Sequence, residues 1–452
     1  MKLSDLAATF GGELRGDCVF DSVSTDTRTL KPGAWFFALK GERHDAHQHL
    51  AQAIAAGASA LIVQKSMVDC PVSQWVVPDT LLALQQAATY WRQECGHVLR
   101  FALTGSSGKT TTKEMLAAML STQGLTLATS GNLNNHIGVP LTLLAIRSEH
   151  RFAVLELGAN HVGEIDQTSA LVLPDCVAIT NIGWAHLEGF GGRQGIAQGK
   201  SEIFQHPGAL GVAVINLDDE WSDYCRSRAQ HLKQITVSAE NPAADVWVAS
   251  KSADEQGCFS LELVVRGSPL PRIQLPVMGE HNVINASLAV GMCLAVPEID
   301  LVQASRGLER MAGIKGRMCR HERGALTIID DTYNANPDSI RKAIDVLAAQ
   351  PGRKILVLGD MAELGSAARE EHVHVGAWAA MKKIDALYAI GEYADFYAEG
   401  FGSNARRYSD RGALIAELLS ELHGVVSLLV KGSRSSQMDE IVDVILKEQG
   451  TC

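Results

Sequence analysis

The stretch that decides the fold is residues 98–123, VLRFAL-TGSSGKTTT-KEMLAAMLSTQ. Its first part is apolar enough for a buried strand, and its last part suits a helix. Between them, Gly105 and Gly108 let the backbone turn tightly, so that successive N–H groups point at the oxygens of a phosphate. The helix N-terminus adds a partial positive charge at the same place. The order of strand, glycine loop and helix therefore predicts a phosphate-binding loop.

The side chains of this loop suit a nucleotide and its metal ion. Lys109 would reach the β- and γ-phosphates, and the Thr110 hydroxyl would bind Mg²⁺. The spacing G-x-x-G-K-T is two residues shorter than the usual G-x-x-x-x-G-K-[ST]. A Gly/Ser turn that caps a helix by chance is the alternative, but the complete order of strand, loop, Lys-Thr and helix favours the phosphate loop. We expect nucleotide contacts from Gly105, Ser106, Ser107, Gly108, Lys109, Thr110 and Thr111.

Apolar segments that end in polar residues continue after the loop, at Phe152–Glu156, Val177–Asn181 and Val212–Asn216. Their alternation with helical segments predicts a parallel sheet with helices on both faces. Glu156 ends its strand where a phosphate-loop enzyme needs a carboxylate for its metal, although such a Glu on its own is usually just solvated. His186 follows the next strand and would be a metal or phosphate ligand, whereas an isolated loop histidine is more often structural.

The chain divides into three α/β regions, at about residues 1–82, 83–313 and 314–452. The first is a small unit of short apolar runs with one helical pattern, and the second holds the loop and the expected parallel sheet. In the third, apolar strands alternate regularly with helices, which predicts a doubly wound, Rossmann-like domain. Its expected helix starts are Asn336 before Pro337, Ser409-Asp410 and Ser435-Ser436.

Two polar clusters outside the loop are candidate ligand sites. In residues 279–286, His281 and Asn285 lie four apart and so on one face of a helix. In residues 330–337, DDTYNANP, polar groups gather at the end of an apolar strand, where open α/β sheets bind ligands. Turn formation would also explain the Asn and Pro residues there, so both interpretations stay open.

The composition limits the possible partners. The 452 residues are 46% hydrophobic, and Lys plus Arg (40) against Asp plus Glu (51) give a net charge of −11. That charge argues against wrapping nucleic acid or lying on an anionic membrane, and no apolar run reaches the ~18 residues of a membrane span. Nine widely spaced cysteines without Cys-x-x-Cys predict reduced thiols, and the N-terminus does not read as a signal peptide. We expect a cytoplasmic monomer with no nucleic-acid partner and no membrane insertion.

Together these motifs resemble those of the Mur ligases, the ATP-dependent amide-forming enzymes of peptidoglycan precursor synthesis. The resemblance covers essentially the whole chain, in the family's order of three domains. The short phosphate loop is the form that this family shares with folylpolyglutamate synthases. Without this context Lys200 would be a helix-surface lysine. Family motifs fall in order on Glu156, His186, Lys200, Asn282, Asn285, Arg317 and Asp331.

Motifs that differ among the family members indicate which member this chain resembles most. Residues 24–28, STDTR, and 36–41, FFALKG, look like the nucleotide-sugar-binding domain of the two later ligases. The ligase that adds the diamino acid carries Asp-Asn-Pro-Arg in its last domain, and this chain has no such motif. Instead, residues 156–165, 331–337 and 358–365 resemble the member that joins D-alanyl-D-alanine to UDP-N-acetylmuramoyl-tripeptide.

The resemblance implies a mechanism through an acyl phosphate. ATP would phosphorylate the tripeptide's C-terminal carboxylate, and the amine of D-alanyl-D-alanine would then displace phosphate. The implied catalytic residues are Lys109, Glu156, His186 and Lys200, with ATP also bound by Asn282, Asn285, Arg317 and Asp331. Two Mg²⁺ ions are implied, one held by Thr110 and Glu156 and the other by His186 and Lys200, the lysine as a carbamate. No residue is identifiable as the general base for the amine.

The other substrate contacts are implied in the same way. The UDP-sugar would be bound by Thr27, Arg28, Arg43, Asp45 and Asn135, and the dipeptide by Tyr333, Asn334 and Asn336. Which diamino acid the tripeptide carries is not implied.

Four other functions share part of this pattern. A Mur ligase that adds the diamino acid differs in its last domain, and a folylpolyglutamate synthase lacks this kind of N-terminal nucleotide-sugar domain. A small-molecule P-loop kinase would not need the third domain. A non-enzymatic nucleotide-binding scaffold would release no phosphate in response to the dipeptide.

Overall fold

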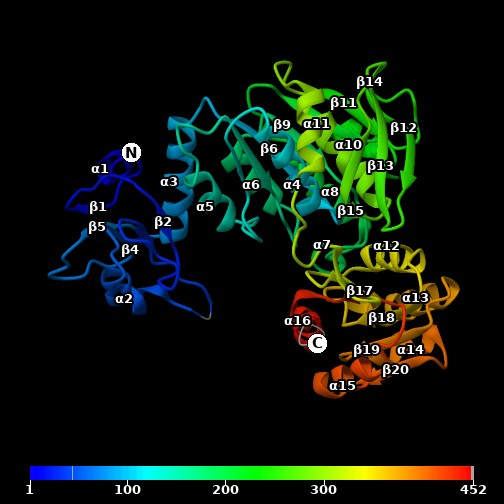
Figure 1. The fold of residues 1–452 in the computed structure, drawn as a ribbon. Helices are drawn as coiled ribbons and strands as arrows, with labels where there is room; N and C mark the ends of the chain where they lie inside the picture. The colour runs from blue at the N-terminus through cyan, green and yellow to red at the C-terminus, as the bar shows by residue number, and fades with distance from the viewer. Residues whose placement is uncertain (43, 449–452) are drawn as a thin grey trace.

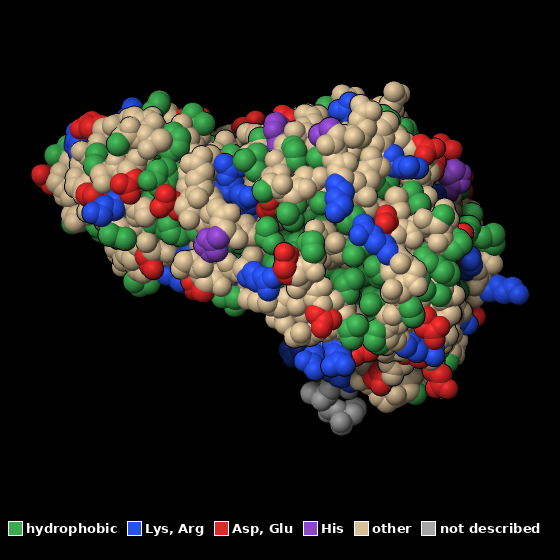
Figure 2. All heavy atoms as spheres, turned by 90° about the horizontal axis from the view of Figure 1, so that it is seen from above, with side chains coloured by type: hydrophobic (Ala, Val, Ile, Leu, Met, Phe, Trp, Pro, Cys, Tyr) green, Lys and Arg blue, Asp and Glu red, His purple; other side chains and the backbone are tan. Residues whose placement is uncertain are grey.

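Three α/β domains follow one another along the chain in this computed structural model, which describes residues 1–42 and 44–448 (Figure 1). Each domain is built on one sheet. Figure 1 shows the N-terminal domain to one side of the middle domain and the C-terminal domain below it. Seen from above, the N-terminal domain is the narrower lobe, and acidic and basic side chains are interspersed over this face (Figure 2). No helix in the described ranges is long and apolar enough to cross a membrane.

The N-terminal sheet has the strand order β1-β5-β4-β3-β2, with β1 antiparallel to β5 and the other neighbours parallel. Two of its interior strands, β3 and β4, are fully apolar and buried, as expected for strands that are covered on both faces. The elements are α1 (Leu3–Phe10), β1 (Glu13–Arg15), β2 (Val23–Ser24), β3 (Trp35–Phe37), the 3₁₀ helix η1 (Ala46–His49), α2 (Leu50–Ala55), β4 (Ala60–Val63) and β5 (Ser73–Val76).

The helix α3 (Thr80–Glu94) connects the first two domains. It begins at Asp79, whose carboxylate accepts the N–H groups of Leu81 and Leu82 at 2.8 and 3.0 Å. One side of α3 packs against β3 and β4, and the other packs against helices of the middle domain. The domain border expected near residue 82 therefore falls inside this helix.

The middle sheet has the order β14-β13-β12-β11-β10-β9-β6-β8-β7, with β15 paired to β13. Its strands are β6 (Leu99–Thr104), β7 (Thr126–Ala128), β8 (Phe152–Glu156), β9 (Cys176–Ile179), β10 (Val212–Asn216), β11 (Lys233–Ser238), β12 (Val246–Ala253), β13 (Cys258–Val265), β14 (Ser268–Pro269) and β15 (Ile273–Met278). Its helices are α4 (Lys109–Ser121), α5 (Gly138–Leu144), α6 (Glu164–Val172), α7 (Leu187–Phe190), α8 (Arg193–Ser201), η2 (Glu202–Phe204), α9 (Ser222–Arg228), α10 (His281–Cys293) and α11 (Leu301–Glu309).

The expected parallel sheet is present from β7 to β12, but the structure extends it with antiparallel strands. β13 pairs antiparallel with β12, β14 and β15. The turn between β13 and β14 has positive φ at Arg266 (47°) and Gly267 (82°). A two-residue turn of this kind joins adjacent strands only in the antiparallel sense, which is why this part departs from the prediction.

The C-terminal sheet has the order β16-β17-β21-β18-β19-β20, parallel except for β16. Its strands are β16 (Cys319–Arg323), β17 (Leu326–Asp331), β18 (Arg353–Leu358), β19 (Ala386–Ile390), β20 (Ala405–Tyr408) and β21 (Val426–Lys431). Its helices are α12 (Pro337–Ala348), η3 (Gly365–Ala367), α13 (Ala368–Met381), α14 (Ala394–Phe401), α15 (Arg411–Glu421), η4 (Arg434–Ser436) and α16 (Asp439–Glu448).

The predicted helix caps of this domain have different outcomes. Asn336 accepts the N–H of Ser339 at 2.8 Å and caps α12, and Asp410 caps α15 in the same way, so both predictions are confirmed. The cap predicted at Ser435-Ser436 is wrong, because both residues lie within η4 and α16 begins only at Asp439. The eight described cysteines are free thiols, as expected, and Cys452 lies outside the described residues.

Candidate active site

The phosphate loop lies where the order of the middle sheet reverses. β6 has β8 on one side and β9 on the other, so its outgoing loop opens at a topological switch point, the usual ligand position in such sheets. The register pairs Leu103 with Glu156, which brings that carboxylate beside the start of the loop. The predicted strand–loop–helix order is confirmed by β6 and α4.

Both glycines of the loop are required by its geometry. Gly105 has φ 151°, and a Cβ there would lie 1.8 Å from Oγ1 of Thr180. Gly108 has φ 79°, and a Cβ there would lie 2.7 Å from Oδ1 of Asn285. A side chain at Gly105 would therefore push the loop away from Thr180, and one at Gly108 would push it away from Asn285 of α10.

The segment after β9 holds the loop in shape. The N–H of Ser107 donates to Oδ1 of Asn181 at 3.0 Å, and Nδ2 of Asn181 donates back to the Ser107 carbonyl at 2.9 Å. The Thr180 hydroxyl donates to the same carbonyl at 2.6 Å. Sequence reasoning missed this support, although Asn181 was recognisable as the polar residue that ends an apolar strand.

A cavity of about 360 Å³ opens over the loop, between the middle and C-terminal domains. This is within the size range of small-molecule sites. Gly105 is the one predicted nucleotide residue that is not part of its lining. The others all line it: Ser106, Ser107, Gly108, Lys109, Thr110, Thr111, Asn282, Asn285, Arg317 and Asp331.

Thr110 and Glu156 form the better-defined half of the predicted metal site. Oγ1 of Thr110 donates to Oε2 of Glu156 at 2.7 Å, and Nδ2 of Asn134 donates to Oε1 at 2.8 Å. Glu156 is buried, and Asn134, which the sequence did not single out, fixes the orientation of its carboxylate. A hydroxyl and a carboxylate oxygen side by side at the phosphate loop fit the preference of Mg²⁺ for hard oxygen ligands.

His186 and Lys200, the other predicted metal ligands, are placed differently. His186 lines the cavity, whereas Lys200 is buried outside its lining with Nζ 5.5 Å from the centre of the Phe190 ring. No carboxylate in the described part of the chain pairs with Lys200. Burial lowers the pKa of Lys200 well below its usual value, and the charge of Lys109 lowers it further. A lowered pKa favours the neutral amine, which is the form of lysine that reacts with CO₂.

No group of three or more His, Cys, Asp or Glu side chains suited to a metal gathers anywhere in residues 1–42 and 44–448. The protein's own side chains therefore offer the first cation one carboxylate and one hydroxyl. For a second cation the cavity lining contains His186 and the Glu164 carboxylate, and Lys200 would add a ligand only as a carbamate.

The cationic residues of the cavity come from both domains. Nζ of Lys109 donates to the Gly105 carbonyl at 2.7 Å. Burial lowers the pKa of Lys109, Glu156 opposes that effect and Arg317 adds to it. The Arg317 guanidinium lies 4.1 Å from the centre of the Tyr333 ring, a cation–π contact that orients it. An anionic ligand in the cavity would therefore face positive charge from two sides.

Sheet register brings Asp331 and Lys431 together at the ends of β17 and β21. Nζ of Lys431 lies 2.5 Å from Oδ2 of Asp331 and 2.8 Å from the carbonyl of Asn334. Burial raises the pKa of Asp331, and the neighbouring charges of Lys431 and Arg317 act in the opposite direction. Sequence reasoning missed Lys431, because only the pairing of two strands far apart in the chain reveals it.

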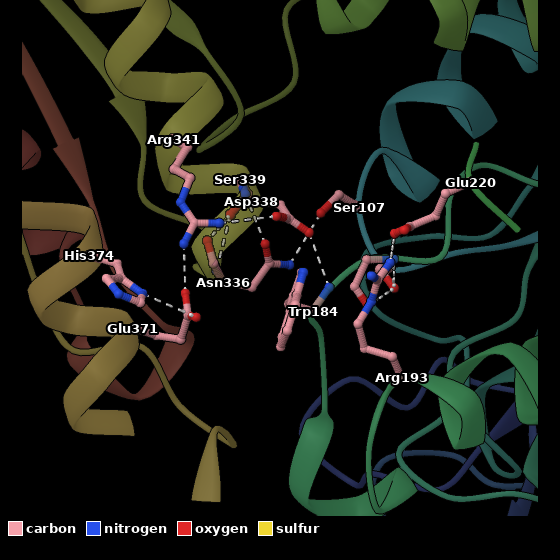
Figure 3. Close-up of polar contacts among 12 residues, drawn as sticks. Ser107, Trp184, Arg193, Glu220, Asn336, Asp338, Ser339, Arg341, Glu371 and His374 are labelled. Carbon is pink, nitrogen blue, oxygen red and sulfur yellow. Dashed lines mark hydrogen bonds and ion pairs between the residues drawn. The ribbon is translucent and has the colours of Figure 1, made fainter. Parts of the chain in front are cut away.

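The C-terminal domain contacts the phosphate loop directly at the start of α12 (Figure 3). Nδ2 of Asn336 donates to Oγ of Ser107 at 3.2 Å. The carboxylate of Asp338 accepts the N–H of Trp184 at 3.1 Å, and Arg341 lies 3.5 Å from the same carboxylate. Figure 3 shows these side chains meeting between the two domains. Tyr333, Asn334 and Asn336, predicted to contact the dipeptide, all line the cavity, and that assignment stays a prediction.

The residues predicted to bind the UDP-sugar come from two domains, and their role stays a prediction. Arg28 is exposed and forms an ion pair with Asp26 at 2.6 Å, and Asp45 caps η1 through the N–H of His47 at 3.0 Å. Thr27 lies with them in the N-terminal domain. Asn135 instead lines the cavity of the middle domain and accepts the N–H of Gly138 at 2.9 Å. Arg43 lies outside the described residues.

This fold and site define an ATP-dependent ligase, and comparison with known proteins identifies the family. A family model described as Mur ligase middle domain matches residues 103–293, and one described as Mur ligase, glutamate ligase domain, matches residues 316–434. The chain belongs to the Mur ligase family.

Particular relatives share the whole length of the chain. The UDP-N-acetylmuramoyl-tripeptide–D-alanyl-D-alanine ligase of Escherichia coli K12 is 41% identical over 462 residues, covering 100% of this chain and 99% of the relative. A crystal structure of MurF from Acinetobacter baumannii superposes with TM-score 0.90 at 38% identity, covering 98% of both chains. MurF from Thermotoga maritima in complex with ADP gives TM-score 0.82 at 25% identity, covering 95% of this chain and 98% of that one.

Proposed function

We propose that this protein joins D-alanyl-D-alanine to UDP-N-acetylmuramoyl-tripeptide at the expense of ATP, releasing ADP and phosphate. The observation that carries the proposal is the likeness over the full chain, N-terminal domain included, to ligases named for this reaction. It is supported by a phosphate loop that faces Arg317 and Asp331 across one cavity. A folylpolyglutamate synthase or a small kinase would not account for a likeness that includes the N-terminal domain.

The chemistry requires two anions to approach each other. An oxygen of the tripeptide carboxylate attacks the γ-phosphorus, and ADP leaves. The dipeptide amine then attacks the acyl carbon, and phosphate leaves as the amide forms. Lys109 and the N–H groups of the loop would neutralise the phosphates, and Arg317 would add charge from the other domain. Contact between the domains would exclude water from the acyl phosphate.

Mg²⁺ held by Thr110 and Glu156 would neutralise charge on the transferred phosphoryl group. We propose that Lys200 is carbamylated, so that with His186 it forms a second Mg²⁺ site. The burial of Lys200 without a carboxylate partner supports the carbamate, because an unmodified Lys200 ammonium would repel a cation. If Lys200→Ala loses activity and acetate or formate restores part of it, the carbamate is supported. Restoration by a small alkylamine instead would establish a cationic lysine.

The reaction is tested by incubating the protein with ATP, UDP-sugar tripeptide and D-alanyl-D-alanine, and by measuring the product mass. Omitting the dipeptide is the control. The tripeptide carboxylate is labelled with heavy oxygen, and the label should appear in the released phosphate. Unlabelled phosphate would exclude the acyl phosphate, and no pentapeptide product would refute the proposed function. The proposal also includes action as a monomer and a cytoplasmic location, of which the free thiols support the location.

A further inference from the structure

A loop of the C-terminal domain reaches the predicted metal ligand His186. Residues 359–365 leave the end of β18, and the Glu363 carboxylate lies within ion-pair distance of Nδ1 of His186 in the middle domain, a buried ring nitrogen that makes no hydrogen bond in this structure. The backbone N–H of Glu188 donates to the Glu363 carbonyl at 3.4 Å, a second contact between the same segments. The reaction scheme given above assigns Glu363 no role.

Both members of this contact have an unusual backbone conformation. His186 has φ 59° and Glu363 has φ 63°, in the left-handed region that residues other than glycine seldom adopt. Such conformations persist where the surrounding structure imposes them, and they gather at functional sites. The backbone on each side of this domain boundary is therefore constrained by its surroundings.

The loop that carries Glu363 is firmly supported from its own domain. The buried ring of His372 accepts the N–H of Met361 at 3.1 Å, and the Tyr397 hydroxyl donates to the Gly359 carbonyl at 3.1 Å. The Asp360 carboxylate accepts two backbone N–H groups just before α14, at 2.9 and 3.0 Å. The position of Glu363 is thus fixed relative to the C-terminal sheet, and its distance from His186 depends on how the two domains sit.

We infer that Glu363 is a positioning residue that accepts the Nδ1–H of His186 and so leaves Nε2 free to bind the second cation. Histidine ligands of metals generally donate their other ring N–H to a carboxylate or carbonyl, which fixes the tautomer and the ring orientation. Here the carboxylate belongs to another domain. The second cation site is therefore complete only when the C-terminal domain is docked. The inference rests on the proposed function, because that function makes His186 a metal ligand.

A simple ion pair is the competing explanation. The Glu363 side chain is 50% exposed and that of His186 21% exposed, and ion pairs so open to water contribute little to stability. An ion pair that only helps the domains to dock would not favour one tautomer of the imidazole. The tautomer therefore separates the two explanations.

The test compares Glu363→Ala and Glu363→Gln with Glu188→Gln, a control that changes a carboxylate in the same contact region while keeping the backbone bond. The ring carbon shifts of histidine-labelled protein without metal report the tautomer, and His186→Asn identifies the signal. Mn²⁺ titration in the presence of a non-hydrolysable ATP analogue, followed by electron paramagnetic resonance, reports the affinity of the cation sites.

We expect His186 to be the Nδ1–H tautomer in the wild type and to shift toward Nε2–H in Glu363→Ala. The weaker Mn²⁺ site should lose about 10–100-fold in affinity. Glu363→Gln, whose amide oxygen still accepts a hydrogen bond, should lose less, and Glu188→Gln should match the wild type. An unchanged tautomer and Mn²⁺ affinity in Glu363→Ala would overturn the inference. So would His186→Asn with wild-type Mn²⁺ binding. Neither readout depends on product, so a failure of the proposed ligase reaction would be seen separately in the product assay.

Discussion

Replacing Asp338 with alanine should weaken the docking of the C-terminal domain on the phosphate loop. The change removes a hydrogen bond from the Trp184 N–H to an ionised carboxylate, at 3.1 Å. It also removes the ion pair of Asp338 with Arg341, at 3.5 Å. Arg341 keeps its second partner, Glu371, at 2.7 Å, so the loss of the ion pair itself should cost little.

The size of the effect follows from these contacts. Hydrogen bonds to charged groups contribute about 1.5–3 kcal/mol, and the partial exposure of Asp338 points to the lower end. A loss of about 1.5 kcal/mol changes the equilibrium between docked and undocked domains roughly tenfold. Fluorescence energy transfer between dyes on the middle and C-terminal domains, in the presence of ADP, measures that equilibrium.

Gly183→Ala provides an independent test of the same contact. A Cβ at Gly183 would lie 2.4 Å from Oδ2 of Asp338, so the added methyl group should push the carboxylate away from Trp184. We expect this variant to reproduce most of the effect of Asp338→Ala, and the double variant to add little to either. Wild-type docking in both single variants would refute the reasoning.

Two other predictions concern the cavity. Lys109→Ala removes the cation that would balance the charge of the γ-phosphate. We expect this variant to lower turnover about 10²–10³-fold in a phosphate-release assay. Near-normal turnover in a folded variant would show that the loop takes no part in the mechanism. Burial and the charges of Lys342 and Lys431 lower the pKa of His281 to about 3. The unfolded chain therefore binds this proton below pH 6.5 and the folded protein does not, so stability should fall by about 2 kcal/mol between pH 6.5 and 5. Urea unfolding should show a shallower pH dependence in His281→Asn, and an identical dependence would count against a neutral imidazole at this position.

The phosphate loop could be predicted from the sequence because its signal is local. Strand, glycines, Lys109 and helix are consecutive, and the conformation follows from steric limits within a few residues. Glu156 and Asn336 were recognisable for the same reason, since Glu156 ends a strand and Asn336 caps a helix. In these places neighbouring residues decide the structure.

The contacts that the sequence did not reveal depend on the pairing of distant segments. Asp331 and Lys431 lie 100 residues apart and meet because β17 and β21 are neighbours in register. Glu363 meets His186 only through the docking of two domains. No local pattern encodes such pairings. The antiparallel extension of the middle sheet was missed because its apolar segments were interpreted only by their alternation with helices.

The helix α3 determines where the N-terminal domain can be exchanged for that of a relative. Four buried apolar residues of α3 belong to one apolar cluster: Ala83, Leu84, Ala87 and Ala88. The same cluster contains Trp35 and Ile62 of the first domain and Leu143 of α5. A chimaera joined at residue 82 would combine a helix from two parents and mismatch both of its faces. A transplanted N-terminal domain must therefore bring α3 with it and also fit the surface of α5, so exchange of this domain between relatives requires two matching interfaces.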